Sequence, residues 1–91
     1  MKTPVVTDQA PAAIGPYSQG IAAEGLVFVS GQLPIDPATG AMPEDVAAQA
    51  KQSLANVKAV LEAAGSSMEK VVKTTIFLAD IADFAAVNEV Y

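Results

Sequence analysis

The stretch that decides the fold reads Leu26-Val27-Phe28-Val29-Ser30-Gly31-Gln32-Leu33-Pro34. Branched and aromatic side chains at 26–29 fill a pleated surface well, so this run predicts a buried strand. Ser30, Gly31 and Gln32 then place a hydroxyl, a bare backbone N–H and an amide where the apolar run ends. These groups predict a hydrogen-bonding site at the rim of the core.

A hairpin connects this strand to the segment before it. Glu24 and Gly25 separate the two, and a two-residue connection suits a tight turn. We therefore expect Tyr17–Ala23 to pair antiparallel with Leu26–Gln32. In that register Tyr17 becomes a neighbour of Ser30.

A long amphipathic helix is predicted between Pro43 and Gly65, with Gly65 as its C-terminal cap. Apolar residues recur at spacings of three and four, which is typical of one helix face: Val46, Ala50, Leu54, Val57, Leu61 and Ala64. The opposite, solvent-facing side is expected to carry Lys51, Asn56, Lys58 and Glu62.

Three further elements are expected. Met1–Val6 is predicted as an edge strand, because Pro4 limits its pairing. Val71–Ala79 alternates like a strand with two unequal faces. A second helix is expected after it, with Asp80 and Asp83 as N-cap candidates and an apolar stripe of Ile81, Phe84, Val87 or Asn88, and Tyr91.

The second helix reaches Tyr91 without a glycine cap or a basic last turn. We therefore expect residues 1–91 to form a single domain that is incomplete at its C-terminus. The alternative is a complete natural domain that ends on Tyr91.

Composition narrows the chemistry. The net charge is −5, all five basic residues are lysines, and histidine and cysteine are absent. A phosphate backbone is bound mainly by cations, so a nucleic acid partner is not expected. Disulfides, thiolate nucleophiles, imidazole bases and the usual zinc ligands are excluded. With no apolar run of signal-peptide or membrane-span length, we expect a soluble cytoplasmic protein.

Four motifs resemble the Rid (reactive intermediate deaminase) family, also known as YjgF and often labelled L-PSP endoribonuclease or translation initiation inhibitor. They are residues 10–20 (APAAIGPYSQG), 29–34 (VSGQLP), 72–78 (VKTTIFL) and 84–88 (FAAVN). Their order and spacing span nearly the whole chain. The resemblance implies a chorismate-mutase-like α+β fold, with a mainly antiparallel sheet backed by two helices and its last strands absent here. It also implies a homotrimer with clefts between subunits.

The resemblance implies hydrolysis of reactive enamines and imines, such as 2-aminoacrylate, to 2-oxo acids and ammonia without a cofactor or metal. The matching substrate-binding positions are Tyr17 as an aromatic wall, Ser30 and the Gly31 N–H as hydrogen-bond donors, and Asn88 as a polar group. Gln32 and Ile35 are further lining candidates. The family's carboxylate-binding arginine and water-activating glutamate are expected beyond Tyr91. The 91-residue chain alone is therefore expected to be inactive and prone to aggregate.

Each position also has a simpler interpretation. Tyr17 could anchor a turn, Ser30 could bond to the backbone at a strand end, and Gly31 could serve an unusual backbone angle or a close approach of chains. Gln32 could bond to the adjacent loop, and Asn88, on the apolar stripe, could be a buried amide bonded to a carbonyl. Lys73 is interpreted as a solvated or interface lysine. The alternative functions are a non-catalytic trimer that binds a small acid or a protein partner, and a ribonuclease or translation inhibitor.

Overall fold

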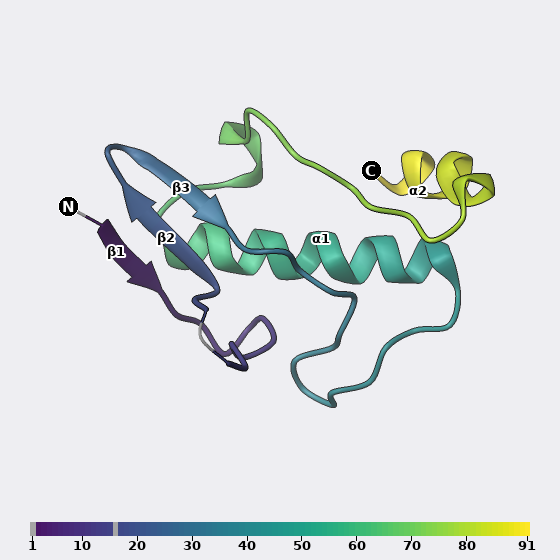
Figure 1. The fold of residues 1–91 in the computed structure, drawn as a ribbon, viewed down its shortest axis with the longest axis horizontal. Coiled ribbons are helices and arrows are strands. Elements are labelled where there is room, and N and C mark those ends of the chain that lie inside the picture. Colours follow the sequence, from purple (N-terminus) through teal and green to yellow (C-terminus); the bar gives the residue numbers. More distant parts are fainter. Residues whose placement is uncertain (1, 16) are drawn as a thin grey trace.

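The computed structural model describes residues 2–15 and 17–91 (Figure 1). Met1, at the start of the predicted edge strand, and Pro16, inside the first family motif, lie outside the described residues.

Three antiparallel strands form one sheet in the order β1-β2-β3, with bounds Lys2–Val5, Gly20–Ala23 and Leu26–Val29. Glu24 and Gly25 join β2 to β3 with φ angles of 52° and 78°, the left-handed pair that a type I′ hairpin turn requires. The predicted hairpin is confirmed, and β1 is an edge strand that pairs with β2. The strands are shorter than predicted, because residues 17–19 and 30–32 lie outside the ladder.

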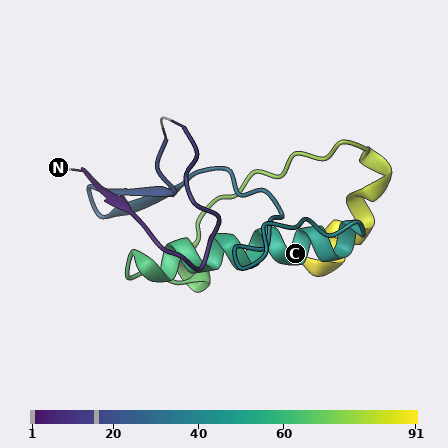
Figure 2. The ribbon, with the colours of Figure 1, turned by 90° about the horizontal axis from the view of Figure 1, so that it is seen from below.

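Strand β3 is not buried on both faces, so that prediction is wrong. Leu26 is 53% exposed and Phe28 59% exposed, whereas Val29 packs against the core residues Val5 and Val60. Helix α1 covers one face of the sheet, and no element of residues 2–15 and 17–91 buries the other (Figure 2). Alternate residues of β3 therefore face protein and open surface.

Helix α1 spans Val46–Ala63, as the apolar spacing predicts. The Asp45 side chain caps it by accepting a hydrogen bond from the Ala48 N–H at 3.1 Å. Gly65 follows the helix with a φ of 82°. The left-handed backbone there is what a glycine after a helix end permits.

The buried face of α1 differs from the prediction. Asn56 and Val60 are 0% exposed, and Leu61 is 6% exposed. The expectation that Asn56 faces solvent is therefore wrong, because its amide is buried against the loop after β3. Val60 lies so close to β2 that a Cβ on Gly20 would approach its Cγ1 to 2.9 Å. The absent side chain of Gly20 thus lets the sheet and the helix approach closely.

Residues 71–80 are not a strand in the described chain, contrary to prediction. They run as an extended segment from the short 3-10 helix η1, Met68–Lys70, back toward the start of α1 (Figures 1 and 2). Val72 and Phe77 are each 92% exposed. A strand is defined by its ladder, and no strand among the described residues pairs with this segment.

The second helix begins as a 3-10 turn, η2 at Ile81–Asp83, and continues as α2 at Phe84–Val90. Asp80 caps the turn by accepting from the Ala82 N–H at 2.9 Å, whereas the Asp83 side chain makes no cap bond. Helix α2 contacts α1. On the predicted stripe only Val87 is buried.

Candidate functional site

Ser30 lies beside the segment that carries Tyr17, as the hairpin register predicts. Its N–H donates to the Gln19 carbonyl oxygen at 3.0 Å, and its hydroxyl donates to the Ser18 carbonyl oxygen. The bond from Ser30 to Gln19 therefore adds one hydrogen bond just beyond the last paired residues of β2 and β3. The resemblance implied Ser30 as a donor, but within the described chain its N–H and its hydroxyl are both engaged, and the Ser30 hydroxyl oxygen keeps its two lone pairs as acceptors.

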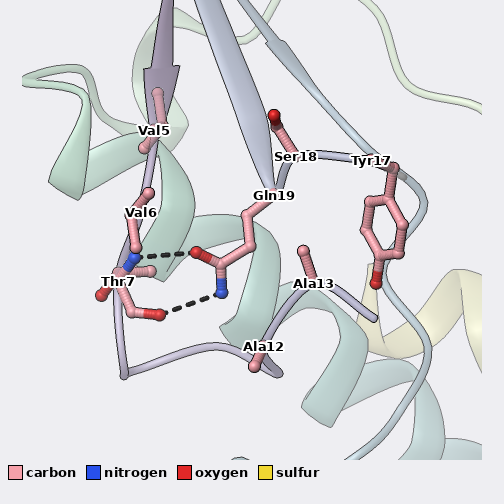
Figure 3. Close-up of a pocket in the computed structure, with 8 residues that line it drawn as sticks. All are labelled: Val5, Val6, Thr7, Ala12, Ala13, Tyr17, Ser18 and Gln19. Carbon is pink, nitrogen blue, oxygen red and sulfur yellow. Dashed lines mark hydrogen bonds between the residues drawn. The ribbon is translucent and has the colours of Figure 1, made fainter. Parts of the chain in front are cut away.

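Tyr17 lines a cavity of about 320 Å³. The cavity lies between the end of β1, the loop after it and the segment before β2 (Figure 3). Half of the tyrosine side chain, 49%, is exposed. The walls combine short aliphatic groups with one ring and three polar side chains: Val5, Val6, Thr7, Ala12, Ala13, Tyr17, Ser18 and Gln19.

The Gln19 amide holds the loop that forms one wall of this cavity. Its Oε1 accepts from the Thr7 N–H at 2.8 Å, and its Nε2 donates to the carbonyl oxygens of Thr7, Ala10 and Pro11 at 2.9, 3.2 and 2.8 Å. The side chain is 3% exposed. Every polar atom of the amide is therefore satisfied by main-chain groups of a single loop.

Gly31 is open on all sides, since a Cβ placed there meets nothing within 4 Å. Its φ lies outside the left-handed region, so glycine is not needed for the backbone angle. The Gly31 N–H makes no hydrogen bond within residues 2–15 and 17–91. An exposed donor beside Ser30 is therefore free to meet a ligand.

The residues after Gly31 form a loop that α1 holds in place. Gln32 Nε2 donates back to the Ser30 carbonyl oxygen at 3.2 Å. The Nδ2 of Asn56 donates to the carbonyl oxygens of Leu33 and Ile35 at 3.0 and 2.9 Å. Ile35, a further lining candidate, is thus fixed through its main chain.

Asn88 lies apart from these residues. It is exposed on α2, so the interpretation of a buried amide is wrong. It lines a second hollow of about 80 Å³, with Val87, Tyr91 and the Ile76 and Leu78 side chains of the extended segment. The Tyr17 cavity and the Asn88 hollow share no residue. A single chain therefore does not bring Asn88 to Tyr17.

Two functional candidates escaped sequence reasoning. Among the described residues, the buried polar side chains are Gln19 and Asn56, both amides. Gln19 lies two residues after Tyr17 inside the first motif, and Asn56 lies one helical turn before Val60. The spacing to the core residue Val60 is the signal that could have placed Asn56 inside.

The described chain offers hydrogen-bonding groups rather than metal ligands. No group of three or more histidine, cysteine, aspartate or glutamate side chains in it could hold a metal ion. Within residues 2–15 and 17–91, no helix combines the length and hydropathy that a membrane span requires.

Residues 7–91 match the protein family described as Endoribonuclease L-PSP. A 2-iminobutanoate/2-iminopropanoate deaminase from Salmonella typhimurium is 56% identical over 91 residues, covering 100% of this chain and 71% of the relative. The Escherichia coli protein of the same name is 54% identical with the same coverage. The crystal structure of Escherichia coli TdcF with bound serine superposes with a TM-score of 0.96 at 50% identity, covering 98% of this chain and 70% of that chain.

Proposed function

The chain belongs to the Endoribonuclease L-PSP family, which includes the Rid proteins, and on that premise we propose that it is a hydrolytic deaminase of reactive enamines and imines. Its substrates are 2-imino acids of the 2-iminobutanoate and 2-iminopropanoate type, and its products are 2-oxo acids and ammonia. The observation that carries the proposal is the 56% identity over all 91 residues to a deaminase of that name. Solved structures of two Escherichia coli relatives share the α+β fold over nearly all of this chain.

The reaction needs few functional groups. Water adds to the imine carbon, a proton moves to nitrogen, and the carbon–nitrogen bond then breaks to release ammonia and leave the 2-oxo acid. The site has to hold the substrate carboxylate, orient the water and stabilise the developing charge. Neither a redox step nor a covalent intermediate with the protein is required.

The described residues offer some of the groups that this reaction needs. The Gly31 N–H is a free donor at an open surface, suited to a carboxylate or carbonyl oxygen. Ser30 presents an acceptor oxygen because its hydroxyl donates a hydrogen bond to the Ser18 carbonyl oxygen. Tyr17 forms the aromatic wall of the neighbouring cavity. We assign substrate binding to these three, with Gln32, Ile35 and Asn88 as further lining residues.

The two remaining functional groups are proposed to come from residues beyond Tyr91. The 91 residues contain no arginine, the side chain best suited to clamp a carboxylate through two parallel bonds. This chain spans 71% of the length of the deaminases it matches. We propose that an arginine and a water-activating glutamate outside residues 1–91 complete the site.

We further propose a cytoplasmic homotrimer in which a neighbouring subunit brings Asn88 to the Tyr17 side of the site. The open face of the sheet supports this, because Leu26 and Phe28 are more than half exposed there. Exposed apolar side chains on one sheet face favour burial in an interface. Sedimentation velocity tests the assembly, and a monomer at micromolar concentration with full activity refutes it.

The function is tested by ammonia release from 2-iminobutanoate generated in situ. Two proteins are compared: residues 1–91, and a chain of the relatives' length that carries the additional arginine and glutamate. We expect the longer chain to accelerate hydrolysis well above the spontaneous rate and residues 1–91 to give little acceleration. A longer chain that binds a 2-oxo acid without any acceleration would support the non-catalytic binder and overturn the deaminase.

A ribonuclease is the second candidate, because the family carries the description Endoribonuclease L-PSP. The net charge of −5 and the absence of histidine weigh against it. RNA cleavage that survives removal of contaminating nucleases, and that disappears on Tyr17→Ala, would favour it over the deaminase.

A further inference from the structure

Gln19 connects three parts of the candidate site: the loop after β1, Ser30 and Tyr17. Its side chain binds the loop from Thr7 to Pro11, and its carbonyl oxygen accepts the Ser30 N–H at 3.0 Å. Tyr17 lies two residues before it in the chain. In Figure 3 the amide points away from the Tyr17 ring and toward Thr7.

The Gln19 amide acts on the loop rather than on the sheet. Its partners are the N–H of Thr7 and the carbonyl oxygens of Thr7, Ala10 and Pro11, none of which belongs to the β1-β2-β3 ladder. An apolar side chain in its place leaves these buried and half-buried main-chain groups without a partner, and they would then turn toward water. The sheet hydrogen bonds would remain, while the loop would move away from the cavity.

That loop continues into the cavity wall that faces Tyr17. Thr7, Ala12 and Ala13 line the same cavity as the ring. Loss of the amide therefore changes the surface against which Tyr17 is placed. A displacement of about 1 Å in a group that orients substrate can lower a rate about 100-fold.

We propose that Gln19 is a positioning residue for the deaminase site: its buried amide fixes the Thr7–Pro11 loop and thereby the placement of Tyr17 relative to Ser30 and Gly31. The proposal rests on the deaminase function for its kinetic part. Its structural part, the placement of Tyr17, stands independently of any activity.

The first test is kinetic and uses Gln19→Met, which keeps the side-chain length and removes the amide. Its matched control is Gln49→Met, since Gln49 Nε2 also donates to a main-chain oxygen at 2.7 Å, and its partner Pro43 is not a candidate site residue. Both variants are assayed in the longer, active chain, well below their melting temperatures. We expect kcat/KM to fall about 10- to 100-fold for Gln19→Met and by less than about twofold for Gln49→Met.

A purely structural role predicts a different pattern. In that case Gln19→Met lowers the melting temperature but leaves kcat/KM of the folded enzyme unchanged, and this result would overturn the proposal. If Gln19→Met does not fold, Gln19→Asn replaces it, because a shorter amide remains polar but cannot span the same four partners.

The second test needs no activity. The 91-residue chain has two tyrosines and no tryptophan, so Tyr91→Phe leaves Tyr17 as the sole fluorescent reporter. In that background we expect Gln19→Met to increase acrylamide quenching of Tyr17 about twofold, while Gln49→Met leaves it unchanged. Unchanged quenching in Gln19→Met refutes the positioning role. Increased quenching in the 91-residue chain, together with a longer chain that does not accelerate 2-iminobutanoate hydrolysis, keeps the positioning role and refutes the proposed function alone.

Discussion

Gly20→Ala tests whether close approach of β2 and α1 shapes the core. The φ of Gly20 lies outside the left-handed region, so alanine fits the backbone. The difficulty is space: the new Cβ would lie 2.9 Å from Val60 Cγ1, 3.2 Å from the Phe28 carbonyl oxygen and 3.6 Å from Val5 Cβ. Val60 is 0% exposed, so its Cγ1 can give way only by displacing packed neighbours.

The expected cost follows from two opposing effects. Inserting one methyl group into a packed core destabilises by about 1–3 kcal/mol. Replacing glycine by alanine recovers about 0.4–1 kcal/mol by restricting the unfolded chain. We therefore expect Gly20→Ala to lower the free energy of unfolding by about 1–2 kcal/mol. For a domain of this size each kcal/mol lowers the melting temperature by about 4–8 °C.

A double-mutant cycle with Val60→Ala tests the mechanism. Val60→Ala alone removes buried methyl groups and leaves a cavity, at a cost of about 2–3 kcal/mol. In the double variant the Cβ added at Gly20 occupies part of that cavity. The combined cost is expected to fall short of the sum of the single costs by about 1 kcal/mol or more.

Urea unfolding followed by far-UV circular dichroism gives all four free energies. Gly31→Ala is the matched control, because a Cβ there meets nothing within 4 Å. Its free energy of unfolding should change by no more than about 0.5 kcal/mol. Strict additivity of the two core substitutions, or a neutral Gly20→Ala, would show that the sheet and the helix are not in the close contact described.

Three further outcomes are expected. Gly31→Ala should reduce kcat/KM in the deaminase assay about tenfold or more while the fold stays stable, because its methyl group would occupy the open space beside the free N–H; unchanged kinetics would remove Gly31 from the site. Asn56→Leu should lower the free energy of unfolding by about 2–4 kcal/mol in urea titrations, since two loop carbonyls lose their donor. Asp45→Ala should cost about 0.5–2 kcal/mol by loss of the α1 cap, and Asp45→Asn, which can still cap, should retain most of the stability in the same titration.

The elements that the sequence predicted well depend on local chemistry. Glu24-Gly25 adopts the left-handed pair that a two-residue hairpin needs, and the helix predicted between Pro43 and Gly65 is α1, Val46–Ala63. The hairpin register also placed Ser30 next to the Tyr17 segment, which the bonds to Ser18 and Gln19 confirm.

The errors concern distant partners. Residues 71–80 have the alternation of a strand, but alternation does not supply a neighbour to pair with. Leu26 and Phe28 read as buried because side-chain type does not reveal which sheet face is covered. Asn56 was predicted to face solvent because it is polar. It is buried because its amide binds loop carbonyls that lie more than 20 residues away in sequence, which the helix pattern alone does not reveal.

The residues of the candidate site also differ in whether they depend on local chain geometry or on distant partners. Tyr17, Ser30 and Gly31 were named from the family resemblance, and the hairpin explains why Ser30 lies beside the segment that carries Tyr17. Asn88, on a different element, lies in a separate hollow of the described chain. Gln19 was overlooked because its importance comes from four bonds to one loop, which no spacing pattern encodes.

The two buried amides have a consequence for how such a scaffold can diversify. Gln19 binds main-chain atoms of one loop, and the Nδ2 of Asn56 binds main-chain atoms of another. Neither depends on which side chains those loops carry. Substitutions at Asp8, Gln9 or Leu33, all exposed, can therefore alter the surface chemistry around the site while the loops keep their shape. New substrate preferences could thus evolve on this framework without rebuilding it.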